Sequence, residues 1–175
     1  SQMVSTTAHG SMSIVMTMLG RPVFDTNITN RLTRDTALTA AARAGHTEVV
    51  RELLRDVHAD PNAINRFGDT ALMAAAKGGH TVVVRVLLRD ERTDPNIFWR
   101  NGDTALIAAA KAGHAEVVRE LLGDERIDPN AINRNRDNAL ITAAKAGRTK
   151  VVRELLRDGR LDPNSVDRIR DNALI

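Results

Sequence analysis

The chain has 175 residues, of which 42% are hydrophobic and 27% charged, ordinary proportions for a folded protein, but only 2% are aromatic and tyrosine is absent. It contains no cysteine, which excludes disulfides, thiolate metal sites and cysteine nucleophiles, and its formal charge of +3 is too small to indicate a nucleic-acid partner. The core must therefore be built from aliphatic side chains.

Residues 1–34 contain a weak copy of a pattern that becomes regular further along the chain. Gly10 and the pair Ile14-Val15 lie 35 positions before Gly45 and the pair Val49-Val50. We interpret this stretch as a degenerate N-terminal repeat that caps the repeats after it.

From Asp35 onward the sequence repeats every 34 residues. The matching segments open at Asp35, Asp69, Asp103, Asp137 and Asp171. The predicted repeats are residues 35–68, 69–102, 103–136 and 137–170, with the start of a truncated further repeat at 171–175. Self-similarity at this spacing indicates a stack of supersecondary units that share one core. Because the last repeat is incomplete, we expect the chain to be a fragment of a longer array.

Each repeat begins with a predicted short helix, which the second repeat illustrates. Leu72 and Ala75 are three residues apart, the spacing of one helix face. Asp69 and Thr70 are the expected N-cap oxygens, and Gly79 is the expected C-terminal stop.

A second predicted helix follows after a tight turn. Val83, Val84 and Leu87 fall on one face, with charged residues opposite. Thr81 is the expected N-cap, and the helix should end near Arg89, because the Asp-Pro-Asn that follows cannot continue it. Helices this short are marginal alone, so neighbouring repeats must stack.

This pattern resembles the ankyrin repeat, with its T-P-L-H tetrad, Gly-His, paired valines and leucines, and Asn-ended turn. The second repeat has, at these places, Thr70-Ala71-Leu72-Met73, Gly79-His80, Val83-Val84, Leu87-Leu88 and Asn96. The proline and histidine of the tetrad are replaced throughout, so the family's Thr-to-His hydrogen bond cannot form. The resemblance implies an all-α solenoid of helix-turn-helix repeats, joined by extended turns, that binds other proteins.

The sequence offers no catalytic, cofactor-binding or metal-binding residues, and we expect no enzyme. His46, His80 and His114 recur at one position, but stacked helices lie about 8 to 10 Å apart, whereas zinc ligands lie about 2 Å from the metal. A structural role at the turn between the helices is expected, and Arg148 takes the same place in the fourth repeat. Phosphate-loop, G-x-S-x-G and H-E-x-x-H motifs are absent.

The largest break in the repeat is Ile97-Phe98-Trp99-Arg100-Asn101, which stands where the neighbouring repeats have 63–67 and 131–135. Trp99, the only tryptophan, replaces an asparagine. By the resemblance, this segment lies on the projecting turn beside the concave face, where a tryptophan is a plausible binding hot spot. An alternative is that Trp99 and Phe98 only cover the edge of the stack beneath the turn.

A ladder of basic residues runs through the repeats, one near the end of each first helix and one in each turn. Its members are Arg43, Lys77, Lys111 and Lys145, and Arg66, Arg100, Arg134 and Arg168. We expect both columns to line the concave side, where they favour an acidic peptide or acidic protein surface, although neighbouring aspartates partly neutralise them. A plain solvated face is an equally good interpretation.

We expect a protein-protein interaction scaffold. One alternative is the substrate-recruiting arm of a longer enzyme or effector, and another, against which the small net charge argues, is nucleic-acid binding through a basic groove. The candidate protein-binding residues are Arg66, Phe67, Asp69, Lys77, Trp99, Arg100, Asn101, Asp103, Lys111, Arg134, Asn135 and Lys145. No membrane insertion is expected, since Met12–Leu19 is shorter than the roughly 20 apolar residues a spanning helix needs. A cytoplasmic location is expected, in a host cell if the protein is a secreted effector.

Overall fold

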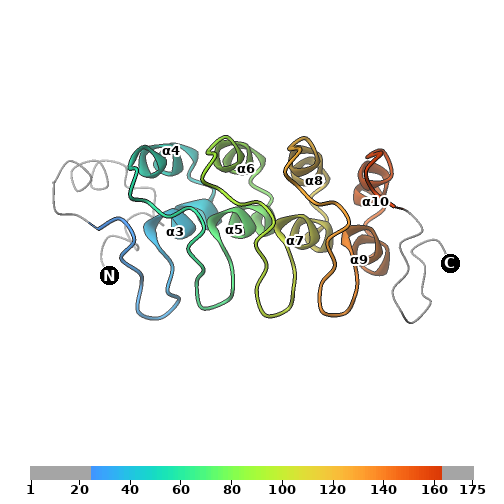
Figure 1. The fold of residues 1–175 in the computed structure, drawn as a ribbon, viewed down its shortest axis with the longest axis horizontal. Coiled ribbons are helices and arrows are strands. Elements are labelled where there is room, and N and C mark those ends of the chain that lie inside the picture. The colour runs from blue at the N-terminus through green and yellow to red at the C-terminus, as the bar shows by residue number, and fades with distance from the viewer. Residues whose placement is uncertain (1–24, 163–175) are drawn as a thin grey trace. The chain divides into compact units, whose positions relative to one another are not determined.

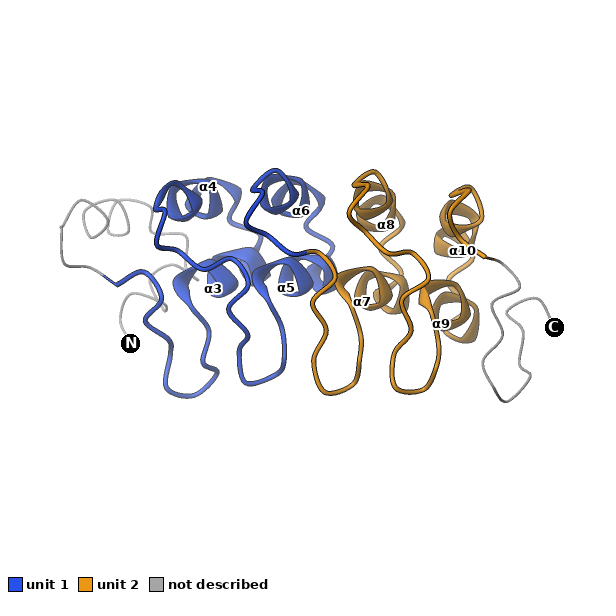
Figure 2. Cartoon of the chain, in the orientation of Figure 1, with its two compact units in different colours: residues 1–94 blue, residues 95–175 orange. Residues whose placement is uncertain are grey.

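The computed structural model describes residues 25–162, which fall into two compact units, unit 1 (residues 1–94) and unit 2 (residues 95–175) (Figure 2). Most of the predicted N-terminal capping repeat and the predicted truncated repeat at 171–175 lie outside the described residues. The described part contains eight helices and no strand, so the predicted all-α class is confirmed. The limits of the individual repeats remain a prediction.

Within the described residues, each unit has two helix pairs (Figure 1). Unit 1 has α3 (Ala37–Ala44), α4 (Thr47–Arg55), α5 (Ala71–Gly78) and α6 (Thr81–Leu88). Unit 2 has α7 (Ala105–Ala112), α8 (Ala115–Leu122), α9 (Ala139–Lys145) and α10 (Thr149–Leu155). Across the described residues, no helix is long and apolar enough to span a bilayer.

The first helix of each pair starts and stops largely as the sequence predicts. In α5, the Thr70 hydroxyl accepts a hydrogen bond from the Met73 amide at 3.2 Å, and Gly79 ends the helix with φ of 74°. The prediction that Asp69 also caps α5 is wrong, because its carboxylate pairs with Lys77.

The start of the second helix differs from the prediction. Residue His80 occupies the N-cap position of α6 without a side-chain capping bond, so Thr81 is the first residue of the helix and not its cap. The helix ends at Leu88, next to the predicted end at Arg89.

Within each unit, first helices pack on first helices and second on second. The pairs are α3 with α5 and α4 with α6 in unit 1, and α7 with α9 and α8 with α10 in unit 2. Ala41 and Ala75 are fully buried, and Leu53 and Leu87 fill the layer behind them. The core is therefore aliphatic, and its small alanines allow close helix packing.

The segments that follow the second helices carry an arginine that ties one repeat to the previous one. The Arg92 guanidinium donates hydrogen bonds to the carbonyls of Leu54 at 2.8 Å and Ala59 at 3.1 Å, and to Asp90. These hydrogen bonds from Arg92 lower the pKa of Asp90, although partial burial opposes them. In unit 2, Arg160 makes the matching contacts.

Candidate functional site

In each unit, long turns project from the layer of first helices, away from the second helices (Figure 1). A buried asparagine organises the turn of unit 1: the Asn65 side-chain oxygen accepts hydrogen bonds from the amides of Phe67 and Asp69, each at 2.9 Å. Its amide group donates to Asp35 of the previous turn at 2.8 Å. Asn133 makes the same three kinds of bond in unit 2. One side chain thus closes its own turn and joins it to the turn before.

At the equivalent position, unit 2 also has Trp99, whose indole has no acceptor atom and cannot close the turn as Asn65 does. Asn101 takes over part of this role. Its side-chain oxygen accepts from the Asp103 amide at 3.1 Å, and its amide group donates to the Asp103 carboxylate at 2.8 Å. Trp99, which stands in place of the turn-closing asparagine, is 40% exposed.

The aspartate that precedes each first helix normally pairs with the basic residue eight positions later. The recorded pairs are Asp35 with Arg43, Asp69 with Lys77, and Asp137 with Lys145. At Asp103 one carboxylate oxygen accepts from Asn101 and the other from Asn133, at 2.8 and 2.9 Å. The structure of residues 25–162 records no ion pair or hydrogen bond for the amino group of Lys111.

The predicted ladder of equivalent cations is therefore corrected. Arg43, Lys77 and Lys145 are neutralised by carboxylates, and only Lys111 differs from them among the described first-helix positions. For Asp35, burial alone would raise its pKa, but the hydrogen bonds from Arg43 and Asn65 together outweigh burial and hold the pKa below its ordinary value. Arg168 lies outside the described residues.

Two adjoining hollows lie between the turns of unit 2, and together they form what we call the turn groove. The aromatic hollow, of about 470 Å³, is lined by Phe98, Trp99, Gly102 and Ile132. The lysine hollow, of about 420 Å³, is lined by Asn101, Asp103, Lys111 and Asn135. Both hollows share Arg100, Asn133 and Arg134 in their linings, so they adjoin.

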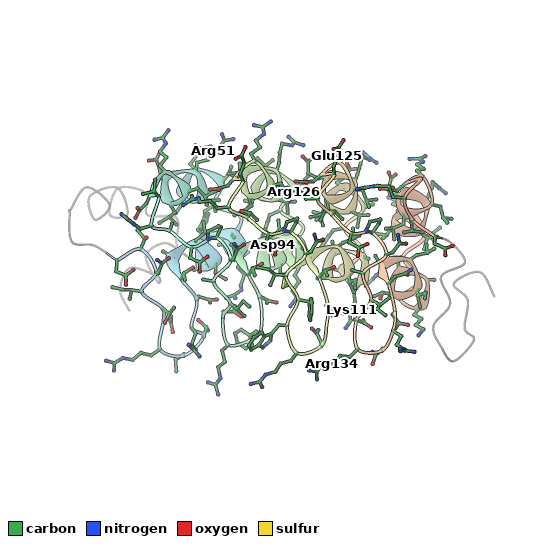
Figure 3. All side chains as sticks on the ribbon, in the orientation of Figure 1. Arg51, Asp94, Lys111, Glu125, Arg126 and Arg134 are labelled. Atoms are coloured by element: carbon green, nitrogen blue, oxygen red, sulfur yellow. The ribbon has the colours of Figure 1, made fainter. Side chains whose placement is uncertain are left out.

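The turn groove combines apolar surface with positive charge. The Arg100 guanidinium lies 5.9 Å from the centre of the Trp99 ring, a cation-π distance. Lys111 and Arg134 are exposed and lie on the turn side of unit 2 (Figure 3). Asp103, the only carboxylate of the lining, is already hydrogen-bonded by two side-chain amides. The groove thus has three cations against one carboxylate.

Seven of the twelve predicted site residues line the groove: Trp99, Arg100, Asn101, Asp103, Lys111, Arg134 and Asn135. Lys145 belongs to unit 2 but is paired with Asp137, and the other four belong to unit 1, namely Arg66, Phe67, Asp69 and Lys77. Sequence reasoning missed Ile132, which is 55% exposed, and Asn133. The recurrence of asparagine at 65 and 133 was the signal that could have identified Asn133.

A third hollow, of about 630 Å³, lies between α4 and α6 in unit 1 and was not predicted. Leu54 and Val86 provide its apolar floor. Val86 stands where the fourth repeat has Glu154, which accepts two hydrogen bonds from Arg119 at 3.1 Å and so bridges α8 and α10. Because unit 1 has Val86 at this position, the surface between α4 and α6 is more apolar than the surface between α8 and α10.

The recurring histidine position has a structural role. The Nε2 atom of His80 is 2.9 Å from the carbonyl oxygen of Arg43, at the end of α3. In unit 2, the Arg148 side chain donates to the carbonyl of Lys111 at 3.2 Å. Within residues 25–162, no group of histidine and acidic side chains is placed to hold a metal ion.

The comparisons with known proteins agree with this architecture. A search among curated proteins finds no match. A family model described as ankyrin repeats (three copies) matches residues 3–98 and 91–167. Since these matches cover most of the sequence and the described part consists of repeated helix pairs, the chain belongs to the ankyrin repeat family.

Proposed function

We propose that this chain binds another protein through the turn groove of unit 2, with Trp99 as the main contact. Ankyrin repeats are generally protein-protein interaction modules, and the family is typically non-catalytic. The observation that supports this site is the exposed Trp99 in place of the turn-closing asparagine. A partly exposed tryptophan at the wall of a hollow is the kind of side chain that dominates interface energies.

The charge of the groove supports a partner with an acidic segment. Arg100, Lys111 and Arg134 have no carboxylate partner among residues 25–162, and Phe98 and Ile132 add exposed apolar surface. A segment with both apolar and acidic side chains would cover this surface and complement its charge.

The recruiting-arm alternative uses the same groove and differs only in what lies outside these residues. Nucleic-acid binding has less support. Proteins that bind single-stranded nucleic acid use several aromatic side chains, on which the bases stack, along a strongly basic groove, whereas this chain has 2% aromatic residues and a net charge of +3. We also propose a cytoplasmic location, for which the absence of cysteine is the only support.

The test is the affinity of a captured and identified partner for the full chain and its variants. We expect Trp99→Ala to weaken binding by about 30-fold, the effect of losing a hot spot of about 2 kcal/mol. The matched control is Phe67→Ala, since Phe67 is an exposed aromatic residue in a turn of unit 1. Circular dichroism of both variants checks that the helices are retained. Unchanged affinity of the Trp99→Ala variant would rule out this site.

A further inference from the structure

Lys111 differs from every other first-helix cation of the described residues, because no pair with its neighbouring aspartate is recorded for it. We propose that Lys111 is a subsite for a carboxylate side chain of the partner, adjoining an aromatic hollow that takes a bulky apolar side chain of the same segment. This inference rests on the proposed function and adds the chemistry and the order of the two subsites.

The cause of the free lysine can be followed through the turn. Because Trp99 cannot accept the amide bonds of its turn, Asn101 folds onto Asp103 and donates to one of its oxygens. Asn133 of the next turn donates to the other oxygen. Both oxygens of Asp103 thus accept side-chain amides, and among residues 25–162 no pair between Asp103 and Lys111 is recorded.

The turn between the third and fourth repeats offers an internal comparison for this explanation. It has Asn135 and Lys145 at the places of Asn101 and Lys111, but it keeps Asn133 at the place of Trp99. There the turn is closed by Asn133, and Lys145 pairs with Asp137 at 2.7 Å. The asparagine at position 101 alone therefore does not free the lysine. The Asp103 turn differs from the Asp137 turn by Trp99 and by the donor Asn133, in whose place the next repeat has Asp167.

A free lysine beside a satisfied carboxylate favours an incoming anion. A ligand carboxylate at Lys77 or Lys145 would have to displace an existing ion pair, whereas at Lys111 it has no competitor. Charge-assisted hydrogen bonds are stronger than neutral ones, and a lysine ammonium offers three donors to such a group.

The two subsites can be filled by one short segment. They share Arg100 and Arg134, whose side chains lie at the junction and provide further positive charge. An apolar side chain against Trp99 and Ile132 and a carboxylate at Lys111 would together bury the exposed ring and neutralise the amino group. The partner segment should thus contain a bulky apolar residue close to an aspartate or glutamate.

The probe is a display library of random 12-residue peptides, selected on the full chain and counter-selected on the Trp99→Ala variant. We expect the enriched peptides to contain a bulky apolar residue near an acidic one. A synthetic peptide of the most enriched sequence is then titrated against the parent chain and against Lys111→Gln. We expect about a 10-fold loss for Lys111→Gln, in the range measured for exchanging one charged hydrogen bond. The matched control is Lys145→Gln, which should leave the affinity unchanged.

Two further measurements separate a direct contact from a general effect of charge. Replacing the acidic residue of the peptide by its amide should weaken binding to the parent chain but not to Lys111→Gln, so that the double-mutant cycle shows coupling. The Asn101→Ala substitution should also weaken binding of the acidic peptide, because Asp103 can then pair with Lys111. Binding of the peptide whose acidic residue is replaced by its amide should change little.

The outcomes distinguish this inference from the proposed function. Peptides that depend on Trp99 but are neutral or basic, or a cycle without coupling, would overturn the carboxylate subsite and leave the proposed function standing. A selection that returns no peptide dependent on Trp99 would overturn both.

Discussion

The turn at 63–69 in unit 1 and the turn at 97–103 in unit 2 perform the same structural task with different side chains. In the first, Asn65 is buried and closes the turn, while in the second Trp99 is 40% exposed and Asn101 forms the polar contacts. The difference shows how a position can lose its structural role within a repeat: its turn-closing hydrogen bonds pass in part to a neighbouring residue, and the position itself becomes exposed. The same rearrangement occupies Asp103 and releases a lysine.

The strongest test of this comparison is to measure how much stability is lost in Asn65→Ala and in Asn101→Ala. Asn65 is 4% exposed, and its loss removes the acceptor of the buried Asp69 amide and of the part-buried Phe67 amide, together with one donor to Asp35. We expect Asn65→Ala to lower the free energy of unfolding by about 3 kcal/mol and Asn101→Ala by about 1 kcal/mol, because buried unsatisfied groups cost more than exposed ones. Urea unfolding at neutral pH measures both. Equal losses would show that the two asparagines carry equal structural weight, contrary to the comparison.

A smaller loss of stability is expected at acid pH, because protonation weakens the contacts of the Asp35 carboxylate without removing the side chain. Its pKa is held below the ordinary value of 3.8, so the charged form is favoured by folding. The resulting stability is fully present above the ordinary pKa and is lost as pH falls through the lower pKa of the folded state. The free-energy difference between the parent and Asp35→Asn should therefore be larger at pH 7 than at pH 3. A difference that does not change with pH would contradict this account of the Arg43 contact.

The recurring position after the first helix gives a third comparison, between His80 and Arg148. Both reach the carbonyl at the end of the preceding first helix, at 2.9 and 3.2 Å. We expect His80→Ala to cost about 1 kcal/mol, the value of one hydrogen bond, and His80→Arg to cost less than about 0.5 kcal/mol. Thermal unfolding of the two variants measures both losses of stability. If arginine is as damaging as alanine, the two side chains are not interchangeable.

The fold was more predictable than the site, for reasons that these residues make plain. Helices such as α5 follow from local signals, because Thr70 and Gly79 act within their own turn, and the alanine core repeats with the fold. That Trp99 stands apart from the other repeats was predictable, since it breaks the repeat, and the structure places it in the wall of a hollow. The state of Lys111 was not, because it depends on whether a carboxylate eight residues away is taken by amides from two turns.

The smallest expected effect concerns the residue before each opening aspartate, where the backbone is left-handed. In unit 1 this residue is Arg34, with φ of 56°, and then Gly68, with φ of 87°; in unit 2 it is Gly102, with φ of 78°, and then Arg136, with φ of 67° in the turn before α9. A residue with a Cβ pays a conformational cost of about 1 kcal/mol in this region, partly offset by the greater freedom of glycine in the unfolded chain. Arg136→Gly should therefore raise the free energy of unfolding by about 0.5 kcal/mol, and the reverse change Gly68→Arg should lower it by a similar amount. Both variants are measured by urea unfolding beside Arg134→Gly, whose residue does not have a positive φ and which should not gain stability. A gain for Arg134→Gly equal to that for Arg136→Gly would mean that removing a basic side chain, and not relieving the backbone, stabilises the turn.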